Sequence, residues 1–147
     1  MKKVFFMLLC ALLLSQWSYA DKKIYTTDTL QLPEKARRFI AEHFPGVDVS
    51  HIKIEKEFWE GKQYDVILTN GFDLDFDSKG EWKEVDGHRS VVPVSVVPVK
   101  IAEYVNKNFP QRQIISIDRD KSKYEVKLTD GKEVEFDRSQ RFIRFDD

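Results

Sequence analysis

Cysteine and histidine are scarce in this 147-residue chain. The one cysteine, Cys10, lies near the N-terminus, so the rest of the chain offers no disulfide, no thiol nucleophile and no thiolate ligand. The three histidines are His43, His51 and His88. None belongs to an HxxxH, HExxH or Cys/His spacing of the kind that holds zinc. The sequence therefore predicts no cofactor and no histidine- or cysteine-based metal centre.

Motifs for covalent catalysis are also missing. The chain has no Gly-x-Ser-x-Gly turn, and its serines lie in predicted turns or in a connecting segment without a placed histidine partner. Its six glycines are scattered singly, so no glycine-rich loop is available to hold a phosphate. We therefore expect no catalytic residues and a protein that is not an enzyme.

Charge of one sign is not in excess. The 24 basic and 25 acidic residues give a formal net charge of −1. Nucleic-acid binding normally needs a clustered basic surface, so the composition argues against a nucleic-acid partner. A basic amphipathic helix is also absent, and we expect no stable insertion into a membrane.

The first twenty residues have the order of a secretory signal. Lys2 and Lys3 precede an apolar run over residues 4–14, which is too short to span a bilayer. Small residues at Ser18 and Ala20 then match the positions that a signal peptidase reads. We predict cleavage near Ala20 and a periplasmic or secreted protein. An uncleaved anchor and a lipidated Cys10 are the alternatives.

The second half of the chain repeats motifs of the first. Residues 32–36 and Phe44-Pro45 recur as residues 97–101 and Phe109-Pro110, an offset of 65. Tyr64-Asp65-Val66 and the residues up to Gly71 recur from Tyr124 to Gly131, an offset of 60. Two short copies of one unit are typical of a duplicated module that shares one core. The predicted divisions are a signal peptide (1–20), a flexible leader (21–31), a first repeat (32–86), a linker (87–96) and a second repeat (97–147).

Each predicted repeat is a helix followed by a four-stranded antiparallel meander. Pro33 and Pro98 suit the first turn of a helix, and apolar residues follow each at helical spacing. The period then changes to two, and Asn70-Gly71 and Asp130-Gly131 mark hairpins at matching places. One face of each meander is apolar and the other is charged, so the helix covers the apolar face. The fold class is α+β.

Two aromatic residues belong to the first copy alone. Phe58 and Trp59 lie in its five-residue excess, beside the predicted turn at Glu60-Gly61. The shared architecture does not require them, and a tryptophan at a hairpin tip is typical of an interface anchor. They are our candidates for binding a partner. The alternative is that Phe58 packs inward and Trp59 covers a neighbouring strand.

Three alternating aspartates allow a weaker hypothesis. Asp73, Asp75 and Asp77, with Glu84 at position twelve, superficially match a calcium-binding loop. Position six is Ser78 instead of glycine, and Leu74 and Phe76 between the aspartates have the spacing of core positions in a strand. We favour a solvated strand face, with a weak cation site as the alternative.

The order of the short motifs resembles the PepSY-like proteins described as β-lactamase-inhibitor-like. The motifs are Leu32-Pro33, Phe44-Pro45, Tyr64-Asp65-Val66, residues 71–77, Gly80-Glu81-Trp82, the Val-Pro linker and residues 124–128. The resemblance implies export and two tandem units that form one continuous sheet with helices on one face. It supplies no catalytic residues. It favours a non-catalytic binding or inhibitory module that engages an envelope protein or peptide; a small-molecule or cation binder using the acidic sheet face is the alternative.

Overall fold

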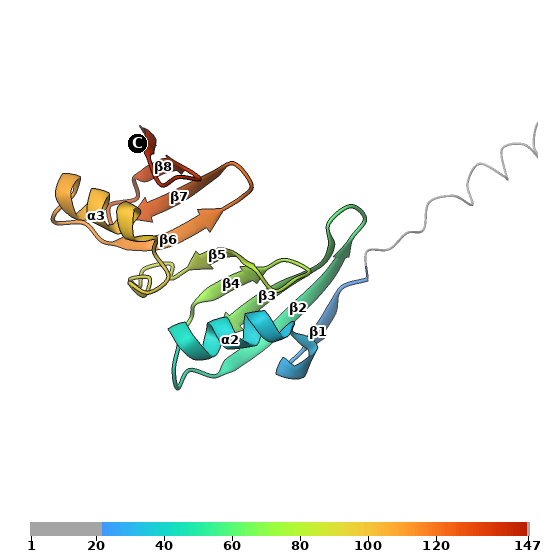
Figure 1. Cartoon of the computed structure of the whole chain (residues 1–147). Coiled ribbons are helices and arrows are strands. Elements are labelled where there is room, and N and C mark those ends of the chain that lie inside the picture. The colour runs from blue at the N-terminus through green and yellow to red at the C-terminus, as the bar shows by residue number, and fades with distance from the viewer. Residues whose placement is uncertain (1–21, 147) are drawn as a thin grey trace, which may run out of the picture.

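Two short helices and nine strands make up the described part of the chain. The computed structural model describes residues 22–146, so the predicted signal peptide and its cleavage site at Ala20 lie outside the described residues. The elements in chain order are β1 (Ile24–Thr26), a 3₁₀ turn (Thr29–Gln31), α2 (Glu34–His43), β2 (Val49–Glu57), β3 (Gly61–Leu68), β4 (Asp73–Phe76), β5 (Trp82–Asp86), α3 (Val99–Asn108), β6 (Ile114–Arg119), β7 (Lys123–Leu128), β8 (Glu133–Asp137) and β9 (Phe142–Asp146) (Figure 1).

The helices begin and end where the sequence predicts. Pro33 is the residue before α2 and Pro98 the residue before α3. Each helix ends at the phenylalanine of a Phe-Pro pair, whose backbone N–H still donates to the carbonyl four residues earlier (2.9 Å to Ile40 and 2.8 Å to Val105). The next residue is proline, which disfavours the helical conformation of the phenylalanine before it.

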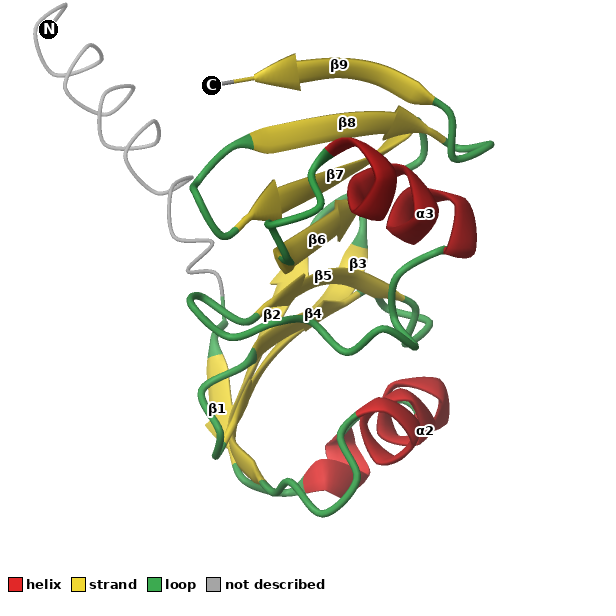
Figure 2. Cartoon of the chain, turned by 90° about the vertical axis from the view of Figure 1, so that its left-hand side faces the viewer, coloured by secondary structure: helices red, strands yellow, loops and turns green. Residues whose placement is uncertain are grey.

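All nine strands form one antiparallel sheet in chain order, from β1 to β9. A single row of side chains crosses the sheet on its buried face through successive cross-strand pairs. The row consists of Ile52, Val66, Leu74, Val85, Ile117, Val126, Val134 and Phe145. The buried residues of both helices belong to the same apolar core as this row. Both helices therefore lie on one side of the sheet, and among residues 22–146 no helix covers the other side, which we call the open face (Figure 2). The described helices are too short to cross a membrane.

The segment between Asp86 and α3 lies against the body of the protein, as its valines predict. Val92 and Val96 are buried in the core. Backbone N–H groups of Gly87 and Val92 donate to the carbonyls of Ile115 and Ile114 at 2.8 and 2.9 Å. A Cβ atom on Gly87 would lie 2.2 Å from the carbonyl oxygen of Ser90, so only glycine fits this turn.

The leader is more ordered than the sequence predicts. Residues 24–26 form β1, which pairs with β2 in the register Ile24 to Ile54 and Thr26 to Ile52. A capped 3₁₀ turn follows, in which the Asp28 carboxylate accepts a hydrogen bond from the Leu30 backbone N–H at 3.0 Å. The prediction of a flexible leader is wrong for these residues. An uncovered edge of β2 would carry unpaired backbone groups, and the β-prone Ile24-Tyr25-Thr26 segment pairs with them.

Candidate binding surface on the open sheet face

Carboxylates form a continuous row across the open face of the sheet. The row, which we call the acidic row, takes one side chain from each strand from β3 to β8. Its members are Asp65, Asp75, Glu84, Asp118, Glu125 and Glu135, each paired with the next across the ladder. They alternate along their strands with the buried apolar row, because successive side chains point to opposite faces of a sheet. A cation continues the row only at its two ends, Lys53 on β2 and Arg144 on β9.

The ends of the acidic row are neutralised. Lys53 Nζ lies 3.0 Å from Asp65 Oδ2. At the other end the Arg144 guanidinium donates to both oxygens of Glu135, at 2.8 and 2.9 Å, and Lys123 donates to Oε1 at 2.6 Å. These hydrogen bonds lower the pKa of Glu135 to about 2.

In the middle of the row, Glu84 and Asp118 form no ion pair with any cation of residues 22–146. Burial, together with the charges of Asp118 and Asp75, raises the pKa of Glu84 to about 7. Burial and the charge of Glu125 raise the pKa of Asp118 to about 6. Adjacent carboxylates on a half-buried surface are costly to ionise together. This part of the face therefore binds protons readily, and other positive charges would relieve the same repulsion.

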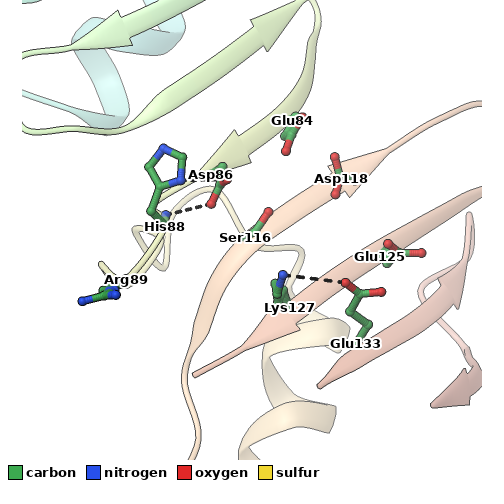
Figure 3. A pocket seen from close by; sticks show the side chains of 9 residues that line it. All are labelled: Glu84, Asp86, His88, Arg89, Ser116, Asp118, Glu125, Lys127 and Glu133. Atoms are coloured by element: carbon green, nitrogen blue, oxygen red, sulfur yellow. Dashed lines mark hydrogen bonds and ion pairs between the residues drawn. The ribbon is translucent and has the colours of Figure 1, made fainter. Parts of the chain in front are cut away.

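A shallow cavity of about 390 Å³ lies over the middle of the row. Figure 3 shows Glu84 and Asp118 side by side on neighbouring strands, with His88 and Arg89 at one rim. Three of the lining carboxylates already have partners. His88 Nδ1 lies 3.2 Å from Asp86, Lys127 Nζ lies 4.0 Å from Glu133, and Lys123 Nζ lies 3.2 Å from Glu125. The lining residues are Glu84, Asp86, His88, Arg89, Ser116, Asp118, Glu125, Lys127 and Glu133.

Three aspartates near the first end of the row approach one another closely. One carboxylate oxygen from each of Asp65, Asp73 and Asp75 lies within 4.8 Å of the other two. One oxygen of Asp65 and one of Asp73 are buried without a hydrogen-bond partner. Burial and the nearby charges of Asp65, Asp75 and Glu84 raise the pKa of Asp73 to about 7. Carboxylate oxygens at this spacing are the ligands that a hard cation such as calcium takes.

This cluster differs from the one that the sequence suggests. Asp73 and Asp75 belong to it, but Asp77 does not, because its Oδ1 accepts the backbone N–H groups of Lys79 and Glu81 at 2.9 Å within the next turn. Asp65 takes its place. The alternation of β3 could have identified Asp65 as an outward residue, since it lies between the buried Tyr64 and Val66 and pairs with Asp75.

Phe58 and Trp59 lie at the tip of the β2–β3 hairpin and are 88% and 90% exposed. Their rings meet edge to face with centroids 4.7 Å apart. Neither side chain is in the core, so the alternative in which Phe58 packs inward and Trp59 covers a neighbouring strand is wrong. Trp82, by contrast, packs against the core, 6.2 Å from the Phe39 ring and 4.0 Å from the Arg119 guanidinium.

One serine does have a histidine partner, contrary to the sequence prediction. His43 Nδ1 lies 2.8 Å from Ser95 Oγ, across a separation of 52 residues. The His43 ring also packs on Phe39, with centroids 4.5 Å apart. Within residues 22–146 no carboxylate forms an ion pair with His43, and Ser95 is exposed. The pair connects the end of α2 to the segment before α3, and it lacks the third group that orients a catalytic base.

One family model matches most of the chain. The family model described as "Putative beta-lactamase-inhibitor-like, PepSY-like" matches residues 14–61 and 62–144. No curated protein matches the chain.

Three similar crystal structures come from Bacteroides. One, from Bacteroides vulgatus, is 37% identical, covers 86% of this chain and 100% of its own, and has a TM-score of 0.82. A second, from the same organism, is 45% identical, covers 88% of this chain and 99% of its own, and has a TM-score of 0.79. The first is described as a "putative periplasmic protein of unknown function". The third, a "putative calcium-regulated periplasmic protein" from Bacteroides thetaiotaomicron, is 41% identical, covers 86% of this chain and 97% of its own, and has a TM-score of 0.79.

Proposed function

The chain belongs to the PepSY-like family, and we propose that it is an exported, non-catalytic binding module. Its open sheet face would contact a positively charged segment of another envelope protein or peptide. The acidic row is the observation that carries this proposal: six adjacent strands each place a carboxylate on the face that neither α2 nor α3 covers. A periplasmic location is supported by the descriptions of the three similar structures.

The electrostatics of the face favour a cationic ligand. Between the end cations the row holds Asp75, Glu84 and Asp118, all with raised pKa values because of burial and mutual repulsion. An extended ligand that runs across the strands would place lysine or arginine side chains over the row and offset that repulsion. Complementary charge of this kind also speeds encounter between two proteins.

The tip of the β2–β3 hairpin supplies a second contact in this proposal. Trp59 is the best candidate for an anchor, because a large aromatic side chain that is almost fully exposed gains most from burial against a partner. It also borders a cavity of about 920 Å³ that reaches Trp82 and Arg119. A partner lying along the open face could reach the tip, since β3 belongs both to the hairpin and to the row.

A partner captured from an envelope extract provides the test of both contacts. We expect the Glu84→Gln/Asp118→Asn double variant to bind it at least tenfold more weakly, with a flatter dependence on salt, because the charges of the row are removed. Trp59→Ala should weaken binding by about 2 kcal/mol while leaving the melting temperature unchanged. Glu42→Gln, on the exposed side of α2, is the matched control. Full binding by both test variants would contradict the proposal.

A calcium-binding function is the second candidate, and the Asp65, Asp73 and Asp75 cluster favours it. Two oxygens of this cluster are buried without hydrogen-bond donors, which leaves them free to coordinate an ion. The description of the similar Bacteroides thetaiotaomicron protein as calcium-regulated supports the same assignment. Calcium bound there would sit at one end of the acidic row and reduce its negative charge.

Thermal unfolding with added calcium tests this candidate. A hundredfold excess over the dissociation constant should stabilise the protein by about 2.7 kcal/mol, because calcium would bind the folded state alone. Asp75→Asn should abolish the rise in melting temperature, and Glu133→Gln, on the far half of the same face, should keep it. Magnesium should have a smaller effect because it gives up its water ligands reluctantly. An unchanged melting temperature in millimolar calcium would contradict the calcium function and leave the protein-binding proposal standing.

We also propose that the chain is a tandem duplication with units at 32–86 and 97–147 joined by residues 87–96. The irregularities of the sheet support this division. Bulges occur at Asp75/Phe76 and Glu135/Phe136, 60 residues apart, and at Val49/His51 and Ile114/Ser116, 65 residues apart. These are the same offsets as in the sequence repeat. The two segments of the family match meet inside the β2–β3 hairpin, at 61/62, and do not mark this division.

A further inference from the structure

Strand β9 forms one edge of the sheet. It pairs with β8 only, and among residues 22–146 no strand covers its outer side. Two apolar side chains near its start, Phe142 and Ile143, are 43% and 49% exposed. The outer backbone groups of an edge strand are ready to pair with another strand, and exposed apolar residues beside them favour such pairing.

Strand β5 has the same bulge as β9 and pairs with a second strand on its other side. β5 and β9 each contain a bulge after their first residue. The bulge of β5 lies opposite Asp75/Phe76 in β4, and the bulge of β9 lies opposite Glu135/Phe136 in β8. After the bulge, residues 84–86 pair with β4 on one side and with β6 on the other. Residues 144–146 occupy the corresponding positions on β8. The bulge therefore leaves the outer edge of β9 able to receive an antiparallel strand, as β5 receives β6.

We propose that the strand received by β9 is β9 of a second copy of this chain. A two-fold axis normal to the sheet makes the two strands antiparallel and keeps their open faces on the same side. Two residues that lie directly opposite each other must then point to the same face. This condition is met only when the two-fold axis passes beside one residue of β9, so that this residue lies opposite its own copy in the partner. Centring on Arg144 opposes two arginines, and centring on Asp146 opposes two aspartates.

Centring on Phe145 removes both conflicts. It places Arg144 opposite the partner's Asp146, twice in the dimer, and stacks the two Phe145 side chains on the helix-covered face. Opposite charges and aromatic pairs are the cross-strand pairs that stabilise antiparallel ladders. Two hydrogen bonds to Glu135 fix the position of the Arg144 guanidinium, so in this register it already lies beside the partner's Asp146. The two acidic rows would then lie on one continuous open face.

Sedimentation of the purified chain over a range of concentrations tests the dimer. We expect the mass to rise from one copy toward two. Asp146→Lys should weaken the association about tenfold, because it places a second cation opposite the partner's Arg144. Within the chain the same change removes the 3.5 Å ion pair between Asp146 and Arg144, but it also relieves the repulsion between Asp146 and Glu133 opposite it on β8, so the melting temperature should change little. Asp146→Glu is the matched control and should keep the dimer. A monomer at every concentration, or a dimer unaffected by Asp146→Lys, would overturn the proposal.

A single cysteine at the proposed axis gives an independent readout. In a chain carrying Cys10→Ser, Phe145→Cys should form an intermolecular disulfide on mild oxidation, since residues directly opposite in antiparallel strands have Cα atoms about 4.5–5.5 Å apart. Tyr25→Cys, on the other edge strand, is the control and should crosslink far more slowly. Equal rates for the two variants, or faster crosslinking through Tyr25→Cys, would overturn the assignment of the interface to β9.

Discussion

Replacing Phe76 or Phe136 with alanine is expected to lower the free energy of unfolding by about 3–5 kcal/mol. Both side chains are fully buried, at equivalent places in β4 and β8. Each meets an aromatic ring of the helix above it edge to face, Phe39 at 5.6 Å and Tyr104 at 5.3 Å. Alanine would leave a cavity between helix and sheet in either half.

Urea unfolding followed by tryptophan fluorescence and by circular dichroism provides the measurement. The buried residues of both halves belong to one cluster, so each variant should unfold in a single transition seen equally by both probes. Phe58→Ala, at the exposed hairpin tip, is the control and should change stability by less than about 0.5 kcal/mol. Separate transitions for the two halves would contradict a shared core, as would a loss below about 1 kcal/mol in either variant.

The helices and hairpins could be predicted from the sequence because their signals are local. Pro33 and Pro98 set the helix starts, and Asn70-Gly71 marks the turn between β3 and β4. Alternating residues such as Tyr64 and Val66 show which face of a strand is buried. Because each of these patterns occurs twice, the order of helices and strands could be predicted without any knowledge of contacts between distant residues.

The pairing of distant strands could not be predicted in the same way. β5 and β6 are joined by a connection that includes α3, and their pairing places Glu84 opposite Asp118. Like charges opposite each other are unfavourable, so the local pattern argues against this register. The burial of Val85 and Ile117 on the other face outweighs that cost. The candidate site depends on this register, which explains why the sequence identified single aspartates but not the acidic row.

The pairing of β1 was missed for a related reason. Its three residues are too few to show alternation, and their neighbours are polar. The strand forms because β2 presents an edge that needs a partner, which is a property of the folded sheet and not of residues 24–26 themselves.

The stability of the protein should rise as the pH falls from 8 to 5. The pKa values of Asp73 and Glu84 are raised to about 7 and that of Asp118 to about 6 in the folded protein, above the usual values near 4. Between about pH 4 and pH 7 the folded state binds more protons than the unfolded state. The free energy of unfolding therefore increases on acidification and decreases as the pH rises toward 7. Because these side chains are partly exposed, solvent screening reduces the effect, and we expect about 1–3 kcal/mol in total.

Below about pH 4 the trend should reverse. Hydrogen bonds from Ser122 and Lys123 lower the pKa of Asp120 to about 2, and those from Arg144 and Lys123 do the same for Glu135. The stabilisation that these two carboxylates provide is present above about pH 4 and is lost as the pH falls toward 2. Melting curves recorded across the acidic and neutral range should therefore show a maximum near about pH 4–6.

Glu84→Gln should raise the melting temperature at pH 8 and flatten the slope between pH 5 and 8. The reason is that a neutral amide replaces a carboxylate that is costly to ionise beside Asp118 and Asp75. Glu42→Gln, at an exposed position of α2, should leave the slope unchanged. If Glu84→Gln melts with the same slope as the unaltered protein, the repulsion within the acidic row is too weak to support a binding role for it.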